Sequence, residues 1–146
     1  MNELKEVRIK RLSKDAIIPK KAYEHDAGFD LHAAENIVLK PLERKLVKTG
    51  IALELPKGYH AEIRPRSGLA LKHGITILNT PATIDTGYRG EIMIILANLG
   101  HEPFEVNKGE RIAQLVFSQV HNVNLKEVEE LSETQRGEKG FGSSGV

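Results

Sequence analysis

The sequence predicts an all-β fold, a sandwich or a barrel, with one short helix and a flexible, glycine-rich C-terminal tail. Short runs of aliphatic and β-branched residues recur along the chain, and Gly, Pro or Asn separates most of them. The 146 residues match the length of one ordinary domain, which can bury a core without a disulfide or a metal. We therefore expect a single domain over residues 1–146, with a core at about 1–131 and an arm at about 132–146.

The predicted strands follow one another along the whole core. They cover residues 7–9, 37–39, 46–55, 59–63, 74–78, 92–97 and 112–120. Residues 92–97 are apolar almost throughout, which predicts a strand buried on both faces, for example at a subunit interface. Residues 67–73 form a short predicted helix with Ser67 as its N-cap. Residues 123–131 are ambiguous, because Leu125, Val128 and Leu131 keep a helical three-residue step while residues 123–125 alternate like a strand.

Composition bears on the compartment and on the classes of partner. Lys plus Arg number 21 and Asp plus Glu number 20, a net charge of +1. This lacks the basic excess of nucleic-acid-binding proteins, so we expect no nucleic-acid partner. Residues 1–12 alternate charges with aliphatics, unlike a signal peptide, and no run approaches the roughly 18 apolar residues of a spanning helix. With no cysteine, the chain is expected in the cytoplasm without membrane attachment.

The last ten residues before the C-terminal valine differ in kind from the core. Residues 136–145 hold four glycines, two serines and one aromatic residue, with no periodic apolar face. Composition alone favours a disordered terminus. The alternative is a segment that closes over a ligand, with Arg136 on an anionic group and Phe141 on a planar one. A phosphate-binding P-loop is rejected, because Ser143 stands where that motif needs lysine.

Two polar segments in the first half of the chain combine charge with glycine. In residues 26–31, strand alternation places Asp26, Gly28 and Asp30 on one side, either as a turn capped by Asp26 or with Asp30 near a site. In residues 64–70, Arg66 can hold an anion in its guanidinium fork. Ser67 and Gly68 would add amides at a helix N-terminus, although a plain loop and cap is the alternative.

Two further segments carry candidate groups. Residues 79–91 predict a β-hairpin in which Asp85 is either a structural turn residue or a functional carboxylate. Gln114 lies inside an apolar run, either satisfied by backbone groups or facing a ligand. The six histidines show no zinc-binding spacing, and no nucleophile elbow is present. From the residues alone, the chain is a β-rich domain with a predicted phosphate site.

Taken in order, five segments resemble the five motifs of the homotrimeric dUTPase family. They are residues 26–31, 65–68, 79–90, 111–117 and 136–145, and the last reads Arg-Gly-x-x-Gly-Phe-Gly-x-Ser-Gly. The resemblance spans nearly the whole chain. It implies a jelly-roll-like β subunit, and it implies that three subunits build three shared active sites. The tail of one subunit would close over a site formed by the two others.

The resemblance also implies a reaction: hydrolysis of dUTP to dUMP and pyrophosphate, which removes dUTP and supplies the precursor of dTMP. Asp85 matches the base that activates a water for in-line attack on the α-phosphorus. The family uses Mg²⁺ that bridges the phosphates with little direct protein ligation. Asp30 would support the metal or the inter-subunit channel only indirectly.

The remaining matches imply contacts with the substrate. Tyr88 matches the residue under the deoxyribose, and the 79–88 segment, with Asn79 and Ile84, matches the one that recognises uracil and excludes a C5-methyl group. The phosphate contacts would come from Arg66, Ser67, Gly68 and, on the α-phosphate, Gln114. In the tail, Arg136 matches the γ-phosphate contact and Phe141, followed by Gly142, the ring that stacks over uracil.

Two departures and two alternatives accompany the resemblance. The Asp-x-Asp-Tyr variant of the third motif reads Asp85-Thr86-Gly87-Tyr88 here, so no second carboxylate can replace Asp85. Ala82 stands where many members have glycine, and a positive φ there would cost roughly 1 kcal/mol and disturb substrate specificity. One alternative is dCTP deaminase of the same fold, whose proton-shuttling Glu would align with Ile95. The other is a catalytically silent trimer that binds nucleotides or regulates a partner.

Overall fold

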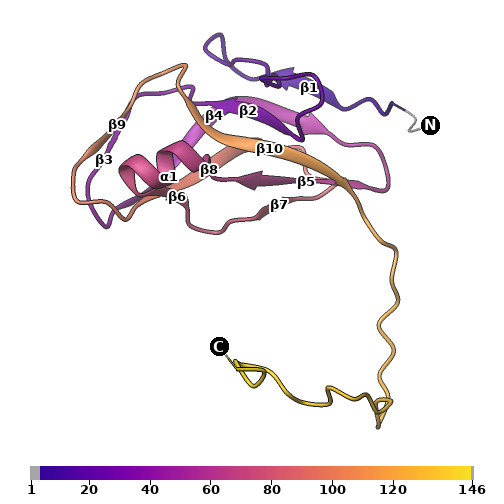
Figure 1. Ribbon diagram of the computed structural model, residues 1–146. Helices are drawn as coiled ribbons and strands as arrows, with labels where there is room; N and C mark the ends of the chain where they lie inside the picture. The colour runs from indigo at the N-terminus through magenta and orange to yellow at the C-terminus, as the bar shows by residue number, and fades with distance from the viewer. Residues whose placement is uncertain (1–3, 146) are drawn as a thin grey trace.

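The computed structural model describes residues 4–145 and confirms a mostly β chain with one short helix (Figure 1). The elements, in chain order, are β1 (Arg8–Arg11), β2 (Gly28–His32), β3 (Ile37–Leu39), β4 (Arg44–Glu54), β5 (Tyr59–Arg64), α1 (Ser67–His73), β6 (Ile75–Ile77), β7 (Ala82–Ile84), β8 (Glu91–Asn98), β9 (Phe104–Val106) and β10 (Arg111–Gln119).

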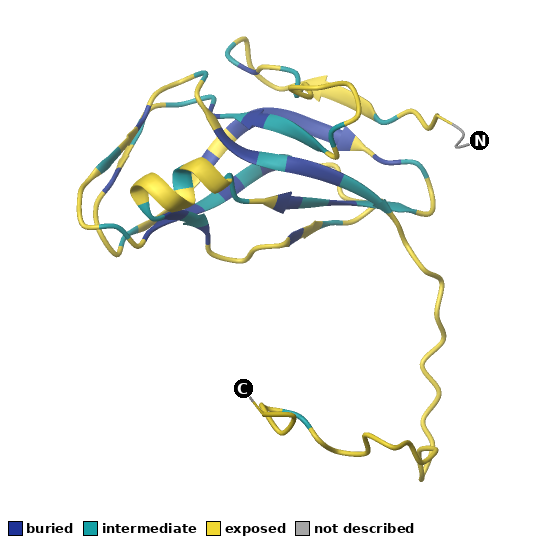
Figure 2. Ribbon diagram, viewed as in Figure 1, coloured by how far each residue is buried: buried dark blue, intermediate teal, exposed yellow. Residues whose placement is uncertain are grey.

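The strands form two four-stranded sheets and a small ribbon, and every pairing is antiparallel. One sheet has the order β1-β4-β8-β6, the other β2-β10-β5-β7, and β3 pairs with β9. Aliphatic side chains from both sheets form the buried core, which is dark blue in Figure 2. The sheets do not close into a barrel, so the jelly-roll-like prediction is confirmed in its sandwich form.

Strand β8 shows how alternation builds this core. Ile92, Ile94 and Leu96 are buried against the opposite sheet, as the two-residue period of a strand requires. On the other face, Met93 and Ile95 are only half-buried. The sequence predicted that this strand is buried on both faces. In the single chain, one face is fully buried and the other is half-buried.

A buried asparagine joins the end of β8 to the β3 side of the fold. The side-chain amide of Asn98 donates to the carbonyls of Leu39 and Glu102, each at 2.9 Å, and its oxygen accepts the Gly100 amide at 2.9 Å. Asn98 is fully buried, so these bonds satisfy an amide that has no access to water. This polar contact fixes the turn that follows β8.

Three details differ from the sequence predictions. Ser67 is the first residue of α1 and not its N-cap; extended Arg66 precedes the helix without a side-chain cap bond. The short strands β7 and β9 were not predicted as strands, and β2 was anticipated only through the strand alternation of residues 26–31. The predicted hairpin over residues 79–91 is wrong, because β7 pairs with β5 while β8 pairs with β4 and β6. Residues 85–90 instead cross from one sheet to the other.

Residues 120–145 extend away from the sandwich and form neither a helix nor a strand (Figures 1 and 2). Both interpretations of residues 123–131 are therefore wrong. Val123, Leu125 and Leu131 are exposed, although each is a large apolar side chain. Over residues 4–145, no helix has the length and apolar character needed to cross a membrane.

Candidate active site

The first group of predicted site residues meets where β10 passes the loop before α1. The side-chain nitrogen Nε2 of half-buried Gln114 donates to the Pro65 carbonyl at 2.9 Å. Arg66 is half-buried beside it, and its Nη1 donates to the Arg111 carbonyl at 3.3 Å. These two bonds hold the loop and its arginine against the strand, so the structure brings Arg66 and Gln114 together as predicted.

The start of α1 leaves donors available next to this arginine. The first intrahelical bond runs from the Ala70 amide to the Arg66 carbonyl at 3.1 Å, so the amides of Ser67 and Gly68 lack helical partners. Both residues are exposed. A Cβ added to Gly68 would have no neighbour within 4 Å, so packing within the chain does not explain this glycine.

Asp30 borders the same group from β2. Its backbone pairs with Gln114 across the sheet, and its carboxylate lies 3.7 Å from Arg111 Nη1. A Cβ on Gly28 would lie 2.4 Å from the Gln114 Oε1 atom, so glycine leaves room for that amide. Asp26 caps its turn by accepting the Tyr23 amide at 3.1 Å, which confirms the structural interpretation of that residue.

The second group lies in the crossover loop after β7. Asp85 is exposed, and within residues 4–145 its carboxylate makes no hydrogen bond or ion pair. The Tyr88 hydroxyl donates to the Glu91 carbonyl at 2.9 Å, and its ring occupies the space beside Gly90, where a Cβ would lie 2.4 Å from the hydroxyl oxygen. Ile84 is half-buried at the end of β7, and Asn79 is exposed in the turn after β6.

The register of β5 and β7 keeps these two groups apart in one chain. Ile84, which precedes Asp85, pairs with Ala61, whereas Arg66 follows Ala61 by five residues in the opposite direction, just beyond the end of β5. At about 3.3 Å per extended residue, Asp85 and Arg66 are on the order of 20 Å apart. One chain alone does not place both groups around one triphosphate.

The tail residues form a third, separate group. Arg136 Nε donates to the Lys139 carbonyl at 2.9 Å, and the Gly137 amide donates to Thr134 Oγ1 at 3.0 Å. Phe141 is fully exposed, and Gly142 follows it in a run of turns. The tail bonds of residues 134–145 all stay within the tail, so Arg136, Phe141 and Gly142 do not join either of the other groups.

The sequence interpretation missed a charged row on the outer face of β5. Glu62 lies between His60, at 3.3 Å, and Arg64, at 2.7 Å. The Arg64 hydrogen bond first, and then the His60 bond, hold the pKa of the Glu62 carboxyl below its usual value. The signal was present in the sequence, because residues at positions i, i+2 and i+4 of a strand share one face.

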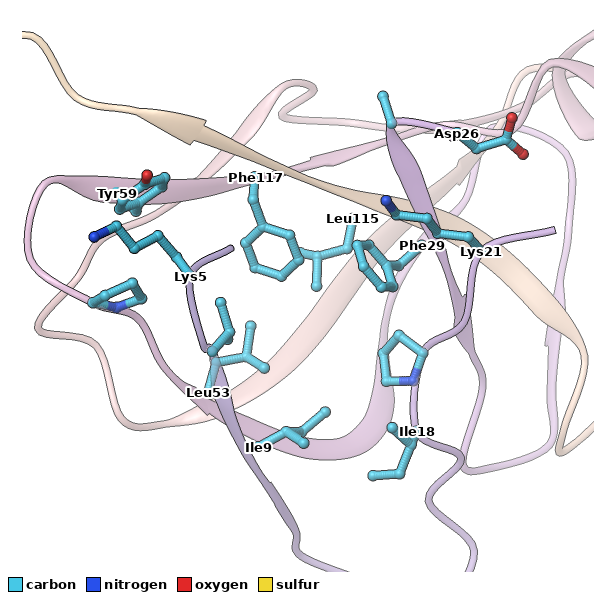
Figure 3. Close-up of a pocket in the computed structure, with 14 residues that line it drawn as sticks. Lys5, Ile9, Ile18, Lys21, Asp26, Phe29, Leu53, Tyr59, Leu115 and Phe117 are labelled. Carbon is cyan, nitrogen blue, oxygen red and sulfur yellow. The ribbon is translucent and has the colours of Figure 1, made fainter. Parts of the chain in front are cut away.

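An apolar pocket of about 520 Å³ lies between the N-terminal segment and the β2-β10-β5 sheet face (Figure 3). The rings of Phe29 and Phe117 meet edge to face at 5.5 Å in its wall, and Lys21 Nζ lies 5.1 Å from the Phe29 ring centre. No predicted site residue lines this pocket. Its walls are mainly aromatic and aliphatic, with Lys5, Lys21 and Asp26 at the charged positions, so it differs chemically from the groups around Arg66 and Asp85.

The structure also shows the surroundings of Ala82 and Ile95, the two positions at which the sequence bears on specificity and on the deaminase alternative. Ala82 lies in β7, pairs with Ile63 and is absent from the residues with positive φ, so alanine imposes no left-handed strain there. Ile95, where a deaminase would carry its glutamate, is half-buried and pairs with Leu46. Among residues 4–145, no three His, Asp or Glu side chains gather as metal ligands.

Comparisons with known proteins all indicate one family. The dUTPase family model matches residues 14–145. Deoxyuridine 5'-triphosphate nucleotidohydrolase of Clostridium novyi is 60% identical over 138 residues, covering 94% of this chain and 97% of the relative.

Two solved phage structures extend the comparison to the fold. The Staphylococcus bacteriophage 80alpha dUTPase with dUpNHpp is 35% identical with a TM-score of 0.90, covering 98% of this chain and 100% of that one. A dUTPase variant from phage phi11 of S. aureus, described with a structural Mg(II) ion, is 28% identical with a TM-score of 0.82, covering 88% and 100%. With its family model, its full-length relatives and its fold in agreement, this chain belongs to the dUTPase family.

Proposed function

We propose that this protein hydrolyses dUTP to dUMP and pyrophosphate. The observation that carries the proposal is the likeness, over 98% of the chain, to a dUTPase that holds dUpNHpp, an analogue of dUTP. The near-full-length nucleotidohydrolase relatives point to the same reaction. The candidate site supports it through three kinds of group: an available carboxylate, an arginine with nearby donors, and an exposed aromatic residue on a long arm.

Asp85 is the proposed general base. A base needs hydrogen-bond reach to its water more than an unusual pKa, and the exposed Asp85 carboxylate has no partner within residues 4–145 that a water would have to displace. It would take a proton from the water as that water attacks the α-phosphorus. The pyrophosphate then leaves in line with the incoming oxygen.

The group around Arg66 is the proposed phosphate site. The guanidinium fork suits a phosphate, and the Ser67 hydroxyl with the amides of Ser67 and Gly68 would add donors around it. Gln114 would contact the α-phosphate. Because its amide is already held against Pro65 at 2.9 Å, the Gln114 side chain would meet the substrate in a fixed position.

Recognition of the base and sugar is assigned to the second and third groups. Tyr88 would lie under the deoxyribose, and the backbone near Asn79 and Ile84 would contact uracil. A methyl group in a permissive apolar pocket changes binding by only about 1–3 kcal/mol, so rejection of thymine needs a rigid backbone. The pairing of Ala82 with Ile63 holds the start of this backbone segment in the sheet, without a positive φ at the alanine.

The arm would complete the site. Arg136 would bind the γ-phosphate, and Phe141 with Gly142 would cover the uracil ring. A closed arm excludes bulk water and so strengthens every electrostatic contact inside the site. Arg136, Phe141 and Gly142 are all exposed in the isolated chain, which leaves them available for that role.

Homotrimeric assembly follows from the same proposal. Asp85 and Arg66 are too far apart in one chain for one triphosphate, so a site that uses both needs groups from more than one subunit. The half-buried Met93 and Ile95 on the outer face of β8 offer apolar surface for such contacts. Three copies would then share three sites.

Mg²⁺ is the proposed cofactor, held mainly by the substrate. Among residues 4–145, no three His, Asp or Glu side chains lie together as metal ligands. Asp30, which borders the proposed phosphate site around Arg66, already faces Arg111. The phosphate oxygens of the substrate would be the main ligands, which suits Mg²⁺ because this ion keeps several waters and seldom binds in an all-protein cage. The ion would supply charge neutralisation for the phosphates, and Asp30 would act only indirectly.

The test is pyrophosphate release from dUTP, dTTP, dCTP and UTP, each measured with Mg²⁺ and with EDTA. We expect release mainly from dUTP and a strong reduction by EDTA. Ammonia release from dCTP would replace the proposal with deamination. Comparable turnover of dTTP would overturn the specificity assigned to the 79–88 segment, and silence with all four nucleotides would favour a non-catalytic binding protein.

A further inference from the structure

The loop that carries Asp85 is held by hydrogen bonds and not by packing. All six residues from 85 to 90 are exposed, so no buried side chain anchors the crossover between β7 and β8. An exposed loop without such bonds samples many conformations. A base on this loop therefore depends on the few polar contacts that fix its backbone.

Thr86, the residue after Asp85, makes the contact that leads back to the core. Its hydroxyl is shared between the carbonyls of Leu55, at 3.1 Å, and Pro56, at 3.3 Å. Leu55 is buried directly after β4, so the acceptor belongs to the rigid part of the fold. The hydroxyl thus links the crossover loop to the β4–β5 turn.

Arg89 reinforces this link from the other end of the loop. Its Nη1 donates to the Thr86 carbonyl at 2.7 Å and to the Tyr88 carbonyl at 3.2 Å, while its Nε lies 3.7 Å from the Glu54 carboxylate on β4. The Tyr88 amide donates to the Asp85 carbonyl at 3.1 Å and closes the turn. Two independent anchors therefore connect the Asp85 backbone to the end of β4.

We infer that Thr86 is a positioning residue for the general base, because its hydroxyl fixes the backbone beside Asp85. The Arg89–Glu54 contact supports it. The catalytic part of this inference rests on the proposed function. The Asp85 carboxylate itself has no partner within residues 4–145, so its place is set by its backbone, and that backbone is set by Thr86. A misplacement of about 1 Å in a reacting group costs about 100-fold in rate. Thr86 acts through Asp85 and does not touch the reacting atoms.

The decisive pair of variants is Thr86→Val, which removes the hydroxyl at nearly constant shape, and Thr86→Ser, which keeps it. We expect Thr86→Val to lower kcat about 10- to 100-fold with KM and dUpNHpp affinity within about threefold of wild type. Thr86→Ser should remain within about threefold of wild type in kcat. Thr76→Val, on β6, is the matched control, because its hydroxyl makes no hydrogen bond within residues 4–145.

A readout that is independent of activity tests the anchor itself. Amide hydrogen exchange at Tyr88, whose amide bonds to the Asp85 carbonyl, should be at least about tenfold faster in Thr86→Val and unchanged in Thr86→Ser and Thr76→Val. Thermal unfolding of each variant checks that the whole fold persists. Wild-type exchange in Thr86→Val, or equal kcat in the two Thr86 variants, would overturn the inference.

A separate variant in the same experiment tests the proposed function. Asp85→Asn should retain dUpNHpp binding and lose most turnover of dUTP. If wild type does not hydrolyse dUTP, or if Asp85→Asn stays active, the proposed base is wrong whatever the Thr86 variants do. In either of those cases the exchange measurement still decides whether Thr86 anchors the loop.

Discussion

Gln114 and Pro65 are joined by a hydrogen bond of 2.9 Å from the side-chain amide of one to the main-chain carbonyl of the other. The bond connects the middle of β10 to the loop that presents Arg66. The Gln114 oxygen at the same time lies where a Cβ of Gly28 would be, so β2 and β10 share this space. The amide is therefore part of the scaffold and of the proposed phosphate site together.

Gln114→Glu tests that double role. The substitution keeps the shape but replaces a donor with a carboxylate oxygen, which repels both the Pro65 carbonyl and a bound phosphate. We expect kcat/KM for dUTP to fall by at least about tenfold, as steady-state kinetics would show. Gln119→Glu, at the exposed end of the same strand, is the control and should stay near wild type. Equal activities of the two variants would contradict the assigned contact.

Removal of residues 136–146 separates the arm from the fold. The hydrogen bonds of residues 136–145 stay within the tail, so the sandwich should keep its thermal unfolding temperature to within a few degrees. Turnover of dUTP should fall at least about 100-fold, because Arg136 and Phe141 are lost. Sedimentation would verify that the truncated chain keeps its assembly state, and full activity after truncation would exclude the arm from the mechanism.

The longest strands were predictable because their aliphatic content and turn residues both point to the same boundaries. Residues 46–55 correspond to β4 and residues 59–63 to β5 within one or two positions. The three-residue strands β7 and β9 lack that local signal, since their pairing with β5 and β3 defines them. Gly87 and Gly90 mark a turn, but a turn residue does not specify which sheet the following strand joins.

The candidate site residues came from the sequence, but their arrangement in the chain did not. The motifs single out Asp85, Arg66 and the tail as candidates, because each combines a chemical group with glycine or proline at a fixed spacing, and their roles stay predictions. Their separation in one chain depends on the β5–β7 register, a long-range property that no local pattern encodes. The Thr86 anchor likewise joins residues far apart in the sequence, since Thr86 lies 31 positions after Leu55 and 30 after Pro56.

Asn98→Leu probes the buried polar contact at the end of β8. Leucine has a similar shape but leaves the Leu39 carbonyl and the Gly100 amide without partners, and each such group costs about 1–3 kcal/mol. We expect a loss of about 2–5 kcal/mol in unfolding free energy, measured by denaturant titration at fixed protein concentration. Asn107→Leu, at an exposed asparagine, should cost less than about 1 kcal/mol, and a similar cost for both would refute the role of burial.

Glu62→Gln should make stability depend less on acid pH. The Arg64 and His60 bonds lower the pKa of Glu62 in the folded state below its usual value of 4.5, so the folded protein favours the charged carboxylate. That stabilisation is present above the usual pKa and is lost as pH falls through the lower folded-state pKa. At pH 7 the wild type should therefore unfold at a higher temperature than Glu62→Gln, and the difference should close between about pH 5 and pH 3.

Melting temperatures of both proteins across that range measure the difference directly. Glu105→Gln serves as the control, because Glu105 lies exposed on β9 and forms no ion pair within residues 4–145. The Glu62→Gln difference from wild type should change with pH more than the Glu105→Gln difference. If the Glu62→Gln difference grew toward acid pH, the folded state would have to favour the protonated carboxyl, and the Arg64 contact would not be the dominant influence on Glu62.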